Sequence, residues 1–368
     1  MKIAIVHDWL IHMRGGERVL EALAEVFPEA VIYTLFSNRG KLSPSLRRMK
    51  IKNSVLQYFP GIRLYYRWLL PLLPFFIRTL KIEPADLVIS SSHCVAKGAR
   101  IPEGAYHVCY CHTPMRYLWG FEDVYFGNFP GWLRVCLIPL FNGLRKWDVA
   151  TAQGVDTFLC NSETVRKRIQ TVYGRDAEII YPPVDADFFN PPHPSLSPQG
   201  GEDGGEGGFY LIVSALTPYK RIDLAVEAFN GLQQKLLIAG EGPLRRSYEN
   251  RVRTENIRFL GRVPGEELRR LYREAKALIF PQEEDFGIVP LEAQASGTPV
   301  IAFARGGALE SVKDGVFFYE QTPQALREAL LQFETQRFDP QILRRHALQF
   351  DKETFKNKIR ESLSHVVR

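Results

Sequence analysis

The residues best suited to chemistry in this chain are two glutamates, Glu284 and Glu292. They stand at the ends of the segment Glu284-Asp-Phe-Gly-Ile-Val-Pro-Leu-Glu292, after a strand-like apolar run and across the start of a helical pattern. Carboxylates accept two hydrogen bonds at once, which suits the hydroxyls of a sugar or a ribose. The backbone amides that open the helix, near Phe286 and Gly287, suit a diphosphate. Two glutamates at this spacing do not predict a function by themselves. The strand before them and the helix between them make the prediction.

Two cations, Lys220 and Arg221, follow the strand-like run 209–214 and precede another helical pattern. At such a strand end they could neutralise a diphosphate leaving group. A solvated surface pair is the alternative when these two residues are taken alone.

The first half of the chain contributes weaker candidates. Gly15 and Gly16 lie between a strand-like run and a helical pattern, where glycine lets a phosphate approach the backbone and the helix start offers amides. A plain turn explains the same pair equally well. His112 closes the strand-like run 106–111, although a single histidine is more often structural.

These candidates need elements that place them together, and the chain alternates strands with helices in both halves. Two such series predict an α/β fold of two doubly wound parallel sheets, with ligands at the carboxyl ends of the strands and in the cleft between two domains. We expect strands at 2–7, 31–36, 86–90, 106–111, 157–160, 209–214, 235–239, 257–260, 277–280 and 299–303, and helices at 17–27, 223–229, 266–274 and 289–295.

A length of 368 residues also favours two domains. Residues 190–208 are dominated by proline and glycine and cannot pack a core. We therefore expect a first domain at 1–188 joined by a closing helix at 350–368, a flexible loop at 189–208, and a second domain at 209–349.

The glutamate segment resembles the E-x7-E signature of the family-4 retaining glycosyltransferases. The resemblance covers residues 1 to about 360, because further motifs stand in that family's order: Gly15-Gly16, Pro218-Tyr-Lys-Arg-Ile-Asp, Gly240-Glu-Gly-Pro and Leu260-Gly-Arg-Val. It implies the GT-B fold, two Rossmann-like domains facing a cleft. The donor, a nucleotide diphosphate sugar, would lie mostly on the C-terminal domain and the acceptor mostly on the N-terminal one.

The resemblance also implies roles for individual residues. Glu284 would contact the sugar hydroxyls at the reacting centre, and His112 would hydrogen-bond the reacting sugar or the acceptor. Lys220 would hold the diphosphate with Arg221 as helper. The other implied donor contacts are Glu292 to the ribose, Gly15 and Gly16 to the phosphates, Arg262 and Val263 near the base, and Phe286, Gly287, Ile288 and Val289 at the helix start.

One departure from the family pattern is Ala215, which stands where many members have an arginine. Either Arg221 supplies the missing charge or the diphosphate is held more weakly. The alanine is also the one feature that leans toward a non-catalytic, membrane-bound assembly partner. A nucleotide-sugar epimerase of similar shape is a further alternative, which would need no lipid acceptor.

The strings His-Thr-Pro-Met-Arg-Tyr-Leu-Trp (112–119) and Pro-Tyr-Lys-Arg-Ile-Asp (218–223) look most like the mannosyltransferases of bacterial O-antigen, lipopolysaccharide and exopolysaccharide assembly. On that resemblance GDP-mannose is the implied donor. Composition and spacing say nothing about the base or the sugar.

The net charge of +6 is concentrated in residues 38–82, which hold ten basic and no acidic residues, interleaved with seven aromatic ones. This mixture suits an anionic membrane surface. The alternative is a helix pair with a core of aromatics and solvated charges; single-stranded nucleic acid fits less well, since nothing else resembles a nucleic-acid module. No apolar run reaches the ~18 residues that span a bilayer, and no signal peptide is evident. We expect a cytoplasmic protein, peripheral on the inner face of the plasma membrane, acting on a lipid-linked glycan.

No metal is expected in the reaction. No cluster of His, Asp or Glu has metal-ligand spacing, and Asp185-Ala-Asp187 follows Tyr-Pro-Pro-Val and is interpreted as a linker turn. No cofactor is expected beyond the nucleotide-sugar substrate. The five cysteines show no metal or redox spacing and are expected as buried thiols.

Overall fold

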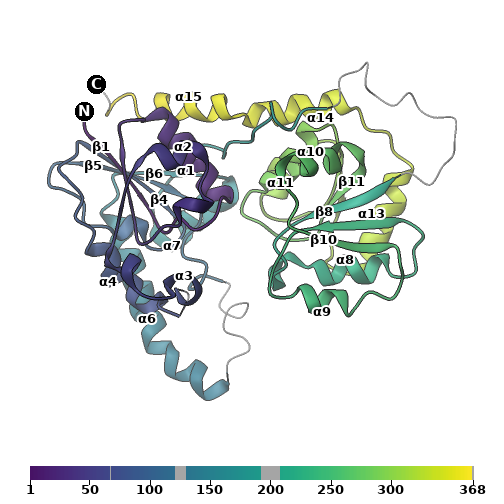
Figure 1. Cartoon of the computed structure of the whole chain (residues 1–368), viewed down its shortest axis with the longest axis horizontal. Coiled ribbons are helices and arrows are strands. Elements are labelled where there is room, and N and C mark those ends of the chain that lie inside the picture. The colour runs from purple at the N-terminus through teal and green to yellow at the C-terminus, as the bar shows by residue number, and fades with distance from the viewer. Residues whose placement is uncertain (67, 121–129, 192–207, 367–368) are drawn as a thin grey trace. The chain divides into compact units, whose positions relative to one another are not determined.

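The computed structural model of the chain describes residues 1–66, 68–120, 130–191 and 208–366 (Figure 1). It divides into two compact units, Met1–Pro183 with Glu353–Arg368, and Val184–Lys352. Each unit is a parallel β-sheet flanked by helices. The predicted fold class, two Rossmann-like doubly wound domains, is confirmed.

The first unit has a seven-stranded sheet in the order β3-β2-β1-β4-β5-β6-β7, with every neighbouring pair parallel. The strand order reverses between β1 and β4, and such a switch point is where ligands of open α/β sheets bind. The strands are β1 (Ile3–His7), β2 (Val31–Thr34), β3 (Lys50–Asn53), β4 (Leu87–Ser92), β5 (Tyr106–Cys111), β6 (Thr157–Cys160) and β7 (Glu178–Ile179).

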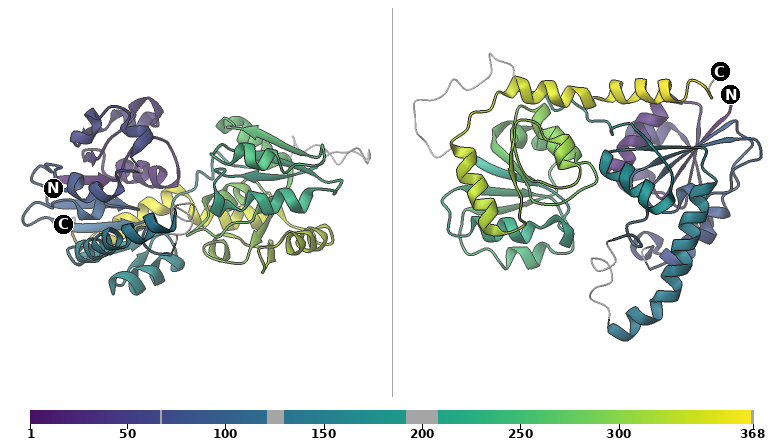
Figure 2. Two further views of the ribbon diagram at one scale, coloured as in Figure 1. Left: turned by 90° about the horizontal axis from the view of Figure 1, so that it is seen from below. Right: turned by 180° about the vertical axis from the view of Figure 1, so that it is seen from behind.

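Helices cover both faces of this sheet (Figures 1 and 2). Apolar side chains of α1, α2 and α15 share one buried cluster with the sheet, and those of α3, α4 and α6 share the other. The closing helix α15, drawn in yellow, therefore belongs to the first unit. The helices are α1 (Gly15–Val26), α2 (Pro44–Arg48), α3 (Ile62–Tyr65), α4 (Leu73–Arg78), α6 (Gly131–Gln153), α7 (Glu163–Tyr173) and α15 (Lys352–Ser362).

The second unit has a six-stranded parallel sheet in the order β10-β9-β8-β11-β12-β13, with its switch point between β8 and β11. Its strands are β8 (Phe209–Val213), β9 (Lys235–Ala239), β10 (Ile257–Gly261), β11 (Ala275–Phe280), β12 (Val300–Phe303) and β13 (Val316–Phe318). Its helices are α8 (Ile222–Phe229), α9 (Arg245–Glu249), α10 (Gly265–Glu274), α11 (Ile288–Ala295), α12 (Ala308–Ser311), α13 (Pro323–Glu334) and α14 (Pro340–Ala347).

Residues 184–188, expected in the first domain, pack with the second unit. The Arg344 guanidinium donates to the carbonyl of Ala186 at 3.1 Å, and Arg269 lies over the ring of Phe188. Asp185 Oδ1 accepts the amide of Phe188 at 3.0 Å, which closes a turn at the position expected for a linker. Most of the loop expected at 189–208, namely residues 192–207, lies outside the described residues.

None of the helices in the described part of the chain is long and apolar enough to cross a bilayer. Four of the five cysteines are buried thiols, as predicted, whereas Cys136 on α6 is exposed.

Candidate functional site

The centre of the second unit's candidate site is an ion pair between Lys220 and Glu284. Lys220 follows β8 and Glu284 follows β11, so the pair spans the switch point of the sheet. Both side chains are largely covered, with 12% and 21% of their surface exposed. Gln282 donates from Nε2 to the same Glu284 oxygen at 3.0 Å. Two residues 64 positions apart, each predicted from its own motif, therefore meet in one place.

Within the described residues, two buried polar atoms without a hydrogen-bond partner belong to residues that are close to this pair in sequence. Thr217 Oγ1 and Gln282 Oε1 are buried and make no hydrogen bond within the described residues. Buried polar groups are nearly always paired, so each of these two atoms has capacity left for a hydrogen bond with a ligand or water. Thr217 precedes Lys220 in the segment after β8, and Gln282 precedes Glu284 in the segment after β11.

Arg221 adopts a left-handed backbone conformation, φ +51°, which a residue with a side chain takes only at a cost of order 1 kcal/mol. Its guanidinium donates to Gln321 Oε1 at 3.1 Å and lies 3.4 Å from Asp223. Gln321 in turn donates to the carbonyl of Pro281 at 2.9 Å. This chain of contacts ties Arg221 to the loop that carries Glu284.

The backbone of the Glu284 loop packs directly against two glycines, Gly306 and Gly307. The amide of Gly307 donates to the carbonyl of Glu284 at 2.8 Å. A Cβ at Gly307 would stand 2.1 Å from the Cα of Phe286, and one at Gly306 would stand 2.3 Å from the Glu284 carbonyl oxygen. The backbones approach so closely that only glycine fits.

The remaining candidates of the second unit lie around this core. Glu292 on α11 is buried, and its carboxylate accepts the hydroxyl of Tyr272 at 2.9 Å, so its contact with a ribose stays a prediction. Phe286 is buried against Phe350. Gly287 caps α11 at φ +101° and is followed by the half-buried Ile288 and Val289. Exposed Arg262 and half-buried Val263 follow β10, the edge strand two positions from β8.

The first unit gathers three histidines at its own switch point. His7 ends β1, His93 follows β4 and His112 follows β5. Ser91 Oγ links two of them, 3.1 Å from His7 Nδ1 and 2.8 Å from His112 Nε2. The ring centroids of the three histidines lie 6.1–6.5 Å apart. His112, the predicted residue, is thus one member of a polar cluster that the sheet assembles.

Asp8 organises this cluster. Its carboxylate accepts the backbone amides of residues 93–96 at 2.6–3.0 Å and contacts His93 Nδ1 at 2.9 Å. Burial would raise the pKa of Asp8, but the charge and hydrogen bond of His93 hold that pKa well below its usual range. Burial would lower the pKa of His93, and the Asp8 charge raises it instead. The pair therefore tends toward carboxylate and imidazolium.

The other two histidines are held neutral. Burial lowers the pKa of His7 to about 4. Burial, together with the charge of His93, lowers the pKa of His112 well below its ordinary value. A neutral imidazole can donate from one nitrogen and accept at the other, so His112 is suited to hydrogen bonding with hydroxyls.

The start of α1 closes this cluster. A Cβ placed on Gly16 would lie 3.6 Å from His112 Nε2 and 3.8 Å from His7 Cε1, which is ordinary van der Waals contact. Gly15 and Gly16 are the first residues of the helix, and both are partly exposed. The glycine pair therefore leaves backbone open beside His112.

Residues 13–188 match the family model described as Glycosyltransferase Family 4, and residues 199–350 match Glycosyl transferases group 1. The chain carries the two domains of a GT-B glycosyltransferase. The histidine cluster and Gly16 lie in the Family 4 domain, and the Lys220–Glu284 pair lies in the group 1 domain.

Curated relatives match parts of this GT-B chain. An uncharacterized glycosyltransferase of Methanocaldococcus jannaschii is 36% identical over 128 residues, 32% of this chain and 33% of that protein. A D-inositol 3-phosphate glycosyltransferase of Thermomonospora curvata is 30% identical over 192 residues, 44% of each chain. The matched segments span between a third and a half of these relatives.

Among solved structures, Anabaena HepE in complex with UDP and glucose matches with a TM-score of 0.67, 18% identity and coverage of 99% of both chains. A likeness at this identity shows a shared GT-B fold.

Reasoning from the sequence missed His7, Asp8, Ser91 and His93. Each stands at or just after the end of a strand, and a polar residue at that place was the available signal. None belongs to a contiguous motif.

Proposed function

We propose that this chain is a retaining glycosyltransferase that takes a sugar from a nucleoside diphosphate sugar. The observation that carries the proposal is the Lys220–Glu284 pair at the β8–β11 switch point, with Thr217 Oγ1 and Gln282 Oε1, both unpaired within the described residues, close to it in sequence. A cation, a carboxylate and unpaired polar atoms together provide partners for both halves of such a donor: diphosphate and sugar hydroxyls.

In the proposed reaction the bond between the anomeric carbon and the diphosphate oxygen breaks, and an acceptor hydroxyl bonds to that carbon from the same face. The hydroxyl proton passes to the leaving diphosphate. Lys220 and Arg221 stabilise the negative charge that develops on the diphosphate, and Glu284 positions the sugar. The neutral His112 hydrogen-bonds the sugar or the acceptor. These residues supply the charge that a metal supplies elsewhere, so turnover is proposed to need none.

The proposed donor is GDP-mannose, on the resemblance of residues 112–119 and 218–223 to mannosyltransferases of surface polysaccharide assembly. HepE was solved with UDP and glucose, which makes UDP-glucose the donor to test beside it.

The proposed acceptor is a lipid-linked glycan at an anionic membrane surface. Eight large apolar side chains of residues 55–75 are more than half exposed, among them Tyr58 at 86%, Leu64 at 77% and Trp68 at 72%. Neighbouring side chains of the same stretch, such as Leu56, Leu70 and Leu73, fill the core behind them. An exposed apolar patch within a basic stretch fits the interface of an anionic bilayer. This favours the membrane over the alternative of aromatics wholly within a core.

The test is a transfer assay with GDP-mannose, UDP-glucose and ADP-glucose, a short-chain polyprenyl diphosphate glycan as acceptor, and EDTA throughout. We expect one donor to give a product whose new linkage keeps the donor's anomeric configuration, as read by NMR coupling constants. The Glu284→Ala variant should lose turnover. Equal turnover of every nucleotide sugar by this variant would show that the site is wrongly assigned.

A further inference from the structure

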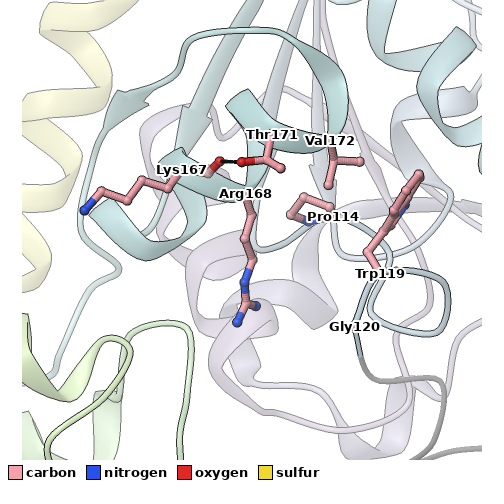
Figure 3. Close-up of a pocket in the computed structure, with 7 residues that line it drawn as sticks. All are labelled: Pro114, Trp119, Gly120, Lys167, Arg168, Thr171 and Val172. Carbon is pink, nitrogen blue, oxygen red and sulfur yellow. Dashed lines mark hydrogen bonds between the residues drawn. The ribbon is translucent and has the colours of Figure 1, made fainter.

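A pocket of about 320 Å³ opens in the first unit, beside the segment that follows His112 (Figure 3). One wall comes from the loop after β5, with Pro114 and Trp119. The other wall comes from α7, with Lys167, Arg168, Thr171 and Val172. None of these residues has a part in the donor chemistry described above.

The Trp119 ring is held in place by a buried ionic centre. Its indole Nε1 donates to Asp148 Oδ2 at 2.8 Å, and Asp148 also accepts the hydroxyl of Tyr173 at 2.9 Å and the ammonium of Lys97. Asp148 and Lys97 are buried. Burial would lower the pKa of Lys97, but the charge and the hydrogen bond of Asp148 raise it, so Lys97 stays protonated. Arg145 lies over one face of this ring, 5.7 Å from its centroid, so a ligand would stack on the other face, whose position costs no ordering on binding.

The α7 wall offers two cations, Arg168 and Lys167. Arg168 is half-buried, and its Nη1 lies 3.5 Å from the hydroxyl of Thr113, the neighbour of His112. Figure 3 shows the Arg168 guanidinium and the Lys167 ammonium pointing in different directions from α7. Lys167 is exposed and lies near Glu163, at 3.9 Å. Of the cations on α7, Arg168 is therefore the one that contacts the segment after His112.

We infer that this pocket is an acceptor subsite for a sugar ring that carries an anionic group. The ring stacks on Trp119 and packs against Pro114 and Val172. A phosphate or carboxylate attached to the ring pairs with Arg168, whose planar guanidinium suits either anion. The inference rests on the proposed function and deepens it, because it names the chemistry of the acceptor and places it beside the His112 segment.

The direct test is ligand-observed NMR titration of the full chain, with a saturating nucleoside diphosphate present to occupy the donor site. The probes are mannose 1-phosphate, glucuronic acid, methyl mannoside and inorganic phosphate. We expect a ring with an anion to bind more tightly than either the neutral ring or the free anion. A preference for mannose 1-phosphate or for glucuronic acid assigns the anion as phosphate or carboxylate. Equal binding of charged and neutral rings would overturn the inference.

Two neighbouring variants separate the pocket from general charge. Arg168→Gln should weaken binding of the charged ring about tenfold, the effect of one charge-assisted contact. Arg166→Gln removes an equal charge from the same helix at a residue that does not line the pocket, and it should leave the affinity unchanged. Trp119→Phe keeps an aromatic ring without the Asp148 hydrogen bond and should weaken charged and neutral rings alike. Equal affinities for Arg168→Gln and Arg166→Gln would contradict the inference.

Kinetics distinguish failure of this subsite from failure of the proposed function. In the transfer assay Arg168→Gln should raise the acceptor KM with little change in the slow hydrolysis of donor by water. If donor turnover is intact and Arg168→Gln leaves the acceptor KM unchanged, the subsite is wrong while the function stands. If the wild-type chain turns over no donor, the proposed function itself fails.

Discussion

At the scale of single residues, the two groups expected to hold opposite ends of the donor contact each other. Lys220 is the proposed partner of the diphosphate, and Glu284 is the proposed partner of the sugar, yet their side chains form an ion pair. Largely covered, this pair is screened less than a surface pair. A donor must therefore compete with Glu284 for the Lys220 ammonium.

This competition gives an unusual prediction for Glu284→Gln. The variant frees Lys220, so a nucleoside diphosphate without sugar should bind several-fold more tightly, by about 1 kcal/mol for a partly covered pair. Sugar transfer should nevertheless fall about a hundredfold or more, because a carboxylate that acts in the transition state is lost. Calorimetry and the transfer assay measure the two effects.

The neighbouring variant Glu283→Gln is the control, and it should change neither quantity. Weaker binding of the nucleoside diphosphate by Glu284→Gln would show that the ion pair does not oppose the ligand.

The neutral histidines make stability depend on pH. Burial lowers the pKa of His7 to about 4, against 6.5 for the ordinary group. Below pH 6.5 the unfolded chain takes up a proton that the folded chain refuses until about pH 4, so stability is lost as pH falls. At pH 5 the cost from this one residue is about 2 kcal/mol. His7→Gln should therefore reduce the loss of stability between pH 7 and pH 5, followed by urea unfolding.

His365→Gln, which removes an exposed imidazole, is the matched control and should leave the pH dependence as it is in the wild type. If His7→Gln and the wild type lose stability in parallel between pH 7 and pH 5, His7 is not held neutral by the fold.

Single residues also show what the sequence could predict. Lys220 and Glu284 were found because each lies in a contiguous motif, between a strand and a helix that the apolar pattern reveals. The histidine cluster was not found as a cluster, because its members come from three separate strand ends and only the sheet order β1-β4-β5 brings them together. The Lys220–Glu284 ion pair was also missed, because a sequence motif does not reveal contacts between side chains that are far apart in sequence.

At the scale of elements, a substitution at the N-terminus of α1 can test whether a ligand needs the space beside His112. A Cβ at Gly16 fits without a clash, 3.6 Å from His112 Nε2. Replacing a helical glycine with alanine stabilises by up to about 1 kcal/mol. Gly16→Ala should thus keep or raise the melting temperature while transfer falls about tenfold or more, because the methyl group occupies the approach to His112.

Gly143→Ala, in α6 with open space around its Cβ position, is the control for the helix effect. Full transfer activity in Gly16→Ala would mean that no ligand approaches the start of α1.

Elements with a clear apolar pattern were predicted well: β5, β6 and β9 have the expected bounds. Several elements were missed, and three of them show the physical reasons. The edge strand β3 is Lys-Ile-Lys-Asn, with little apolar content, and β13 has only three residues. Helix α6 contains Pro139 and exposes apolar side chains such as Val135 and Ile138. Its apolar residues are therefore not confined to one face, and the sequence lacks the periodic pattern that predicts a helix. Residues 184–188 were misplaced because their contacts with Arg344 and Arg269 are distant in sequence.

At the scale of the whole molecule, the exposed aromatics of residues 55–75 should set where the protein works. A variant with Tyr58→Ser, Trp68→Ser and Phe75→Ser should lose most of its flotation with anionic vesicles. Each of these side chains is more than 60% exposed, so the fold should persist. Binding by the wild type should fall as salt rises, because the basic residues of the stretch act through screened charge.

The same triple variant should keep its turnover of a short-chain, water-soluble acceptor, which separates membrane attachment from catalysis. If vesicle binding depends neither on lipid charge nor on salt, the proposed electrostatic contribution of the basic residues is wrong.

The measurement that most directly tests the central claim is calorimetry of the full chain with GDP, UDP and ADP and their sugars. We predict that one nucleoside diphosphate binds and that Lys220→Ala lowers its affinity about tenfold or more, the effect of losing a charge-assisted contact. Lys235→Ala, at the start of β9 and so at the opposite end of the sheet, should bind as the wild type does. Absence of binding by every nucleotide, or equal binding by Lys220→Ala and the wild type, would contradict a donor site at the β8–β11 switch point.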